Sequence, residues 1–121
     1  MGMFRNDPVT AIARTGAAAI VLVMVYYFAT SDAIRADNPF LVPDAVLTVL
    51  LAVTSLLPRP IALPGMAFGF AWSAAVFTVS LFTYVVRGEL PATHIVLITC
   101  CLALAILLLR RLSRPPRVRR P

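Results

Sequence analysis

Four long apolar blocks, separated by short polar segments, dominate the chain. They cover residues 9–29, 40–57, 65–86 and 93–109, and none has the charged face that a surface helix of a soluble protein presents. A helix needs about 20 residues to cross roughly 30 Å of hydrocarbon. The pattern therefore predicts four membrane-spanning helices, of which the second and the fourth are short for a full crossing.

Proline and glycine mark the boundaries between these blocks. Pro58 and Pro60 are predicted to end the second helix, and Pro64 is predicted to lie just before the third. Because the connections are short, consecutive helices are expected to be antiparallel neighbours. The predicted fold is all-α: a compact four-helix transmembrane bundle of up-down-up-down order over residues 1–112, followed by a basic tail over 113–121.

Composition supports a membrane protein and argues against a nucleic-acid-binding domain. Hydrophobic residues make up 60% of the 121 residues, against about 45–50% in soluble domains. The net charge is +6, but six of the eleven basic residues fall in the last twelve positions instead of spreading over a folded surface. No nucleic-acid partner is therefore expected.

The distribution of arginines predicts the orientation in the membrane. With four spans, nine of the eleven arginines lie on the side of the two termini, and only Arg35 and Arg87 lie on the other side. The positive-inside rule then places both termini in the cytoplasm and the protein in the plasma membrane as a multi-pass protein. A cleaved signal peptide ending near Ala29 is the alternative for the first block, but bulky aromatic residues at 26–28 argue for an uncleaved span.

The basic tail has a physical partner in the membrane itself. Each Lys or Arg near a cytoplasmic surface is attracted to anionic lipid headgroups by about 1 kcal/mol. The residues expected to contact such headgroups are Arg110, Arg111, Arg114, Arg117, Arg119 and Arg120.

A stripe of small residues is predicted to pack the third helix closely against a neighbour. Gly65, Gly69 and Ser73 recur at four-residue spacing, which extends the GxxxG pattern by one small residue. Two helix backbones can approach closely where glycine has no Cβ. The partner in this seam is either another helix of the same chain or a helix of a second protomer.

Asp44 is the most informative single residue. It lies at the edge of the second block, where it is expected to stabilise the start of the helix. The other interpretations are an ion pair with Arg87 at the outer end of the third span, and a ligand site. His94 lies on the same side, but its spacing from the acids supports no metal site. Neither a metal nor a cofactor is expected.

The sequence contains no constellation typical of an enzyme. The middles of the spans lack ionisable residues, which usually mark an ion or substrate path. Small multidrug-resistance transporters are similar in length and number of spans, but this first span lacks their essential glutamate. The expected function is that of a non-enzymatic accessory or assembly subunit of a membrane complex, or of a homo-oligomer. The alternative is a small oligomeric transporter or flippase, with a path along Gly65, Gly69 and Trp72.

Overall fold

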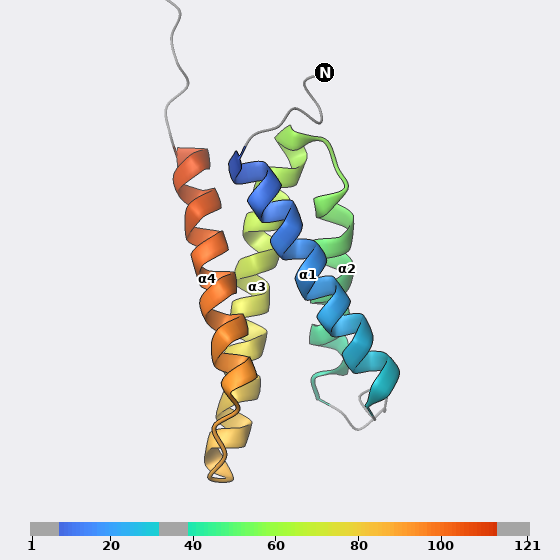
Figure 1. Ribbon diagram of the computed structural model, residues 1–121, viewed down its shortest axis with the longest axis vertical. Helices are drawn as coiled ribbons and strands as arrows, with labels where there is room; N and C mark the ends of the chain where they lie inside the picture. The colour runs from blue at the N-terminus through green and yellow to red at the C-terminus, as the bar shows by residue number, and fades with distance from the viewer. Residues whose placement is uncertain (1–7, 32–38, 114–121) are drawn as a thin grey trace, which may run out of the picture.

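The computed structural model describes residues 8–31 and 39–113, and these ranges form four helices (Figure 1). The helices are α1 (Pro8–Thr30), α2 (Leu41–Ser55), α3 (Arg59–Val86) and α4 (Ala92–Ser113). Three of them, α1, α3 and α4, are long and apolar enough to cross a membrane. The 15 residues of α2 make a helix of only about 22 Å at 1.5 Å per residue. The all-helical fold is thus confirmed, and three helices meet the length requirement for a span.

The start of α3 differs from the sequence prediction. The helix begins at Arg59, and Pro64 lies inside it, so the prediction that Pro64 precedes the helix is wrong. Pro60 is in the first turn, where a missing N–H costs nothing, and Pro64 removes only one bond near the helix start. The carbonyl of Pro58 accepts the N–H groups of Ile61 and Ala62, at 3.0 and 2.8 Å, and fixes this start.

The turn between α3 and α4 ends α3 sharply. Gly88 has a φ of +80°, the left-handed conformation that favours glycine. The N–H of Gly88 donates to Val85 and the N–H of Glu89 donates to Tyr84, both at 2.9 Å. This pair of bonds is a Schellman motif, which satisfies the last carbonyls of the helix. It reverses the chain so that α4 returns along α3.

The packing is organised around α3. It contacts α2 on one side and α4 on the other, while α1 lies against α2 and, over a smaller area, against α4 (Figure 1). Gly65, early in α3, meets Thr54, late in α2, whereas the Trp72 indole N–H donates to the carbonyl of Pro43, early in α2, at 3.3 Å. These contacts show that α2 and α3 run in opposite directions.

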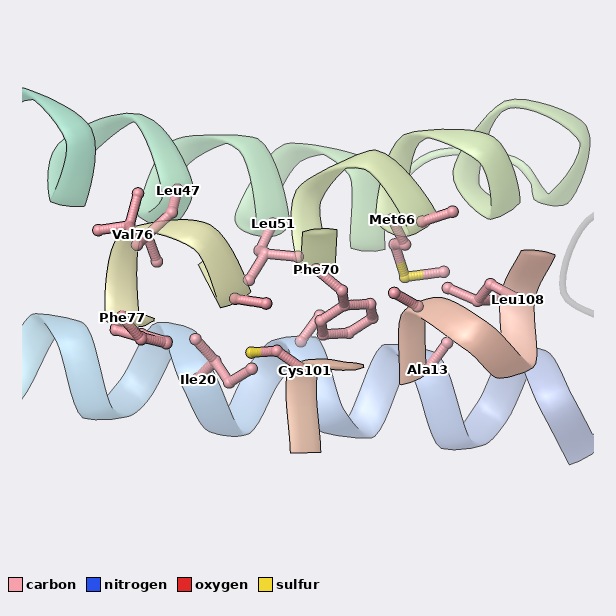
Figure 2. Close-up of a cluster of buried hydrophobic side chains, with 14 of the residues drawn as sticks. Ala13, Ile20, Leu47, Leu51, Met66, Phe70, Val76, Phe77, Cys101 and Leu108 are labelled. Atoms are coloured by element: carbon pink, nitrogen blue, oxygen red, sulfur yellow. The ribbon is translucent and has the colours of Figure 1, made fainter. Parts of the chain in front are cut away.

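A single apolar cluster joins all four helices. Figure 2 shows the ring of Phe70 in the middle of this cluster. Apolar side chains with no exposed surface come from each helix. Examples are Ala13 from α1, Leu47 and Leu51 from α2, Met66 and Phe70 from α3, and Cys101 and Leu108 from α4.

Candidate functional site

A cavity of about 130 Å³ opens at the end of the molecule where α1 and α3 finish and α2 and α4 begin. This is the lower end in Figure 1. All four helices line it, and we call it the Asp44 cavity. Its apolar walls are Val23, Met24, Phe77 and Leu97, and its polar lining consists of Tyr27, Asp44, Ser80, Tyr84, Thr93 and His94. It therefore combines a carboxylate, an imidazole and two phenols in one small space.

Asp44 lies in the first turn of α2 and is only 7% exposed. Its backbone N–H donates to Phe40 at 2.9 Å, and its carbonyl accepts the hydroxyl of Thr48 at 2.8 Å. Its side chain does not cap the helix, because the N-cap is Phe40 and no side chain there forms a capping bond. Within the described residues, the carboxylate has no hydrogen bond or ion pair. The positive end of the α2 dipole is its nearest electrostatic support.

His94 is held in the first turn of α4 by contacts with α3. Its Nε2 lies 3.0 Å from the hydroxyl oxygen of Ser80, and its ring packs against Tyr84 with centroids 5.1 Å apart. Nδ1 is buried, and among the described residues it has no hydrogen-bond partner. If Nε2 donates to Ser80, Nδ1 is left as an acceptor.

Arg87 lies beside the cavity, with its guanidinium 4.8 Å from the centroid of the Tyr84 ring. This is a cation–π contact on an exposed surface. In the described part of the chain, the structure gives Arg87 no ion pair with Asp44. The proposed Asp44–Arg87 ion pair therefore stays a sequence prediction.

The small-residue stripe of α3 faces α2 within the same chain. A Cβ added to Gly65 would lie 2.6 Å from a methyl carbon of Thr54, and one added to Gly69 would lie 2.8 Å from a methyl carbon of Leu51. Ser73 is fully buried, and its hydroxyl donates to the carbonyl of Gly69 at 2.7 Å. The three residues therefore pack against protein and do not line either of the two cavities described here.

Trp72 lies at a second, larger cavity of about 410 Å³ between the start of α2 and the middle of α3. The walls are almost entirely apolar: Pro39, Phe40, Pro43, Ala75, Val76 and Val79 surround the indole. The indole N–H is satisfied by the carbonyl of Pro43. This groove offers space but few polar groups with which to orient a ligand.

Three comparisons were made with known proteins. No protein-family model, no curated protein and no solved structure matches the chain.

Groups that hold metals or cofactors are sparse in the described residues. Residues 8–31 and 39–113 contain no group of three or more His, Cys, Asp or Glu side chains that could hold a metal ion. Cys100 and Cys101 are free thiols, the first exposed and the second fully buried. Their adjacent positions place them on different sides of α4.

The opposite end of the molecule is basic. The guanidinium of Arg14, in α1, donates to the carbonyls of Ser55 and Leu57, the second at 3.0 Å. Those carbonyls lie at the end of α2, so Arg14 satisfies groups that the helix leaves unpaired and complements the negative end of its dipole. Arg110 and Arg111 lie in the last turn of α4. The other predicted headgroup contacts, Arg114, Arg117, Arg119 and Arg120, lie outside the described residues.

Sequence reasoning missed the role of Arg14 and, although it put His94 on the same side as Asp44, it did not predict that polar residues gather around Asp44. The signal for the second feature was present in the predicted topology. Asp44 and His94 open the second and fourth helices, and helices two apart begin at the same end of an antiparallel bundle. Their side-chain burial, in contrast, depends on packing that the sequence pattern does not encode.

Proposed function

We propose that the protein crosses the plasma membrane four times, with both termini in the cytoplasm. Three helices are long enough to span, and the short α2 is flanked by apolar residues: Phe40 before it, and Leu56 and Leu57 after it. A helix shorter than the hydrocarbon thickness is accommodated by local thinning at a modest cost. Nine arginines on the side of the termini support the orientation.

Reporter fusions test this orientation. Fusions at Asn38 and Gly88 should be active outside the cytoplasm, and fusions at Arg59 and after Arg114 should be active inside it. A reporter found outside at the C-terminus would contradict both the number of spans and the orientation.

We further propose that the protein is a non-enzymatic membrane subunit that associates laterally through α4. The observation that carries this proposal is the exposed face of α4. Only three of its 22 residues are buried, and the small side chains of Thr99, Cys100 and Ala103 are exposed in the middle of the helix. Interfaces between membrane helices are enriched in small residues, because these allow close backbone approach. Homo-oligomerisation is the simplest form, and an accessory or assembly role in a larger complex uses the same face.

The two adjacent cysteines provide a matched test of this interface. In native membranes, mild oxidation should cross-link a Cys101→Ala variant through Cys100, and should not cross-link a Cys100→Ala variant, because Cys101 is fully buried. Thiol-to-thiol cross-linkers with an apolar spacer extend the test to partners of a different sequence. If neither reagent captures the Cys101→Ala variant in its native membrane, α4 faces lipid and the lateral-association proposal fails.

The membrane surface is the second proposed partner. The arginines that end α4 and the tail after it would lie in the cytoplasmic headgroup region, where anionic lipids attract them. This attraction requires no fixed structure in the tail. It supports the orientation and the association of the C-terminal segment with the bilayer.

A small oligomeric transporter or flippase remains the second candidate. The path first expected along Gly65 and Gly69 runs where α2 packs against α3. The observation that favours this candidate is instead the Asp44 cavity, since a buried carboxylate in a membrane helix commonly marks a substrate or ion site. A transporter must release its ligand on the other side of the membrane from where it binds. A subunit needs only to bind a ligand or to assemble with its partners.

A further inference from the structure

We propose that the Asp44 cavity binds the ammonium group of a small organic cation. This inference goes beyond the proposed subunit role and does not depend on lateral association through α4. It is based on three features of the cavity: a buried carboxylate without a partner among the described residues, aromatic walls, and a volume suited to a few non-hydrogen atoms.

The buried carboxylate is the first feature. Asp44 is more than nine-tenths buried, lines the cavity and, in the described residues, has no hydrogen bond or ion pair to its carboxylate. Burying an ionised carboxylate is costly unless a cation or several hydrogen bonds compensate for the lost water. The nearby guanidinium of Arg87 lies over the Tyr84 ring and not on this carboxylate. The cavity therefore offers a negative charge to a cation from outside the chain.

The aromatic walls are the second feature. Tyr27, Phe77, Tyr84 and His94 contribute rings to the lining. The face of an aromatic ring attracts a cation, and this attraction strengthens when water is excluded, as in the aromatic cages that bind methylated ammonium groups. The Tyr84 ring already contacts one cation, the Arg87 guanidinium, 4.8 Å from its centroid. A carboxylate combined with such rings favours an organic cation over a bare metal ion.

The volume of the cavity and its polar lining further limit the size and the chemical class of the ligand. A volume of about 130 Å³ has room for several water-sized groups. It admits a methylated ammonium or an ethanolamine-sized group but not a bulky one. The hydroxyls of Ser80 and Thr93 belong to the same lining and can accept N–H bonds. Nδ1 of His94, which has no partner among the described residues, can also accept when Nε2 carries the ring proton. One carboxylate without a group of three metal ligands does not suit a divalent metal.

An ammonium group can reach this cavity from two sources. A soluble amine can enter from the aqueous phase, and the headgroup of an aminophospholipid can enter from the bilayer, since the cavity lies at one end of the helices. The chemistry is the same in both cases. An experiment with separate aqueous and lipid arms distinguishes them.

In the aqueous arm, the full chain is purified in a maltoside detergent, which contains no ammonium group. Its unfolding temperature is measured with methylammonium, tetramethylammonium or ethanolamine chloride, and with sodium chloride at equal ionic strength. We expect a saturable rise with at least one ammonium salt that sodium does not produce. Tetrabutylammonium, which exceeds the cavity, should not reproduce it. In the lipid arm, native mass spectrometry compares the retention of phosphatidylethanolamine by the wild-type chain with its retention by Asp44→Asn, because the arginines are expected to retain anionic phosphatidylglycerol independently of the cavity.

The variants assign the binding to the cavity. Asp44→Asn keeps the shape of the side chain and removes its charge, so the affinity for the ammonium probe should fall about tenfold or more. Glu89→Gln is the matched control, because it removes one exposed carboxylate near the same end of the molecule outside the cavity. Tyr84→Leu, which removes an aromatic ring from the cavity, should also weaken binding. It replaces Asp44→Asn in the test if that variant does not fold.

The outcomes show whether the cavity binds an ammonium group and whether that group comes from a soluble amine or from a lipid. A response to free amines alone, to phosphatidylethanolamine alone or to both supports the site and identifies its source of ligand. The proposal is overturned if the wild-type protein does not distinguish ammonium from sodium and retains phosphatidylethanolamine no better than Asp44→Asn does, as is expected of a carboxyl group that stays protonated. It is equally overturned if folded Asp44→Asn binds the probe as tightly as Glu89→Gln does.

Discussion

Gly65→Ala tests the closest helix contact between α2 and α3. A Cβ at Gly65 would lie 2.6 Å from Cγ2 of Thr54 and 3.1 Å from its Cβ. Both distances are shorter than carbon–carbon van der Waals contact, and neither atom is the tip of a flexible chain. Thr54 is β-branched, nearly buried, and held by a bond of 2.6 Å from its hydroxyl to the carbonyl of Leu50. Relief therefore requires the two helices to separate.

The expected magnitude follows from two opposing effects. Inserting a methyl group into a packed interface without room costs about 1–3 kcal/mol. Replacing glycine by alanine inside a helix recovers up to about 1 kcal/mol of helix propensity. The net loss in the free energy of unfolding should therefore be about 0–2 kcal/mol, and the contact of 2.6 Å to a β-branched side chain favours the upper end of this range. Gly16→Ala is the control, because there the new Cβ meets only the terminal Cδ1 of Leu104, which can rotate away. Its net effect should be close to zero.

The assay is reversible unfolding of the purified protein in mixed micelles as the denaturing detergent is increased. Thr54→Ser removes the obstructing methyl group and keeps the hydroxyl, so a double-mutant cycle isolates the clash. The combination of Gly65→Ala with Thr54→Ser should recover most of the stability lost by Gly65→Ala alone. The reasoning fails if Gly65→Ala is no more destabilising than Gly16→Ala, or if Thr54→Ser does not reduce its effect.

Three further predictions concern Arg14, Gly69 and the basic tail. Arg14→Leu should destabilise the fold by about 1–3 kcal/mol in the same micelle assay, because it leaves the part-buried carbonyls of Ser55 and Leu57 unpaired. Arg14→Lys should lose less stability, and equal losses would show that the two-pronged guanidinium, which reaches both carbonyls, is unimportant. Gly69→Leu should cost at least about 1–3 kcal/mol, since a Cβ there already meets Leu51 at 2.8 Å, and unchanged thermal stability would place that face toward lipid. Truncation after Leu112 should preserve the topology, and the tail of the full chain should be protected from trypsin in anionic vesicles but not in neutral ones; equal protection in both kinds of vesicle would refute lipid binding.

The sequence pattern predicted the helices well and their ends less well. Long apolar blocks with proline or glycine between them identify four helices because lipid-facing and core-facing residues are both apolar. The start of α3 was misplaced because proline has two opposite roles: it interrupts an established helix, but it is tolerated in a first turn. Pro58 serves as the N-cap, and Pro60 and Pro64 lie within the helix. The start of α3 is fixed by the bonds from Ile61 and Ala62 to the carbonyl of Pro58. The hydropathy pattern does not indicate these bonds.

The candidate site was only partly predictable for a different reason. Asp44 was singled out because it lies at the edge of an apolar block, but a helix-start role, an ion pair and a ligand site could not be separated from the sequence. Its surroundings depend on the rotation of all four helices about their axes. Phe77, Ser80 and Tyr84 reach the cavity because they share one face of α3, and that face is fixed by the packing of α3 against its neighbours.

The short length of α2 accounts for the polar groups at both of its ends. At about 22 Å, α2 is much shorter than α3, whose 28 residues extend about 42 Å, so both ends of α2 lie against other helices. A helix end leaves unpaired N–H or carbonyl groups that must be satisfied where they are buried. Arg14 satisfies the carbonyl end with a positive charge. At the amino end, Asp44 supplies the opposite charge, which also matches the helix dipole, but the neighbouring helices continue past it and leave the cavity. A longer α2 would fill this space with its own first turn, so the site that we propose for an ammonium group is a direct consequence of a helix too short for its neighbours.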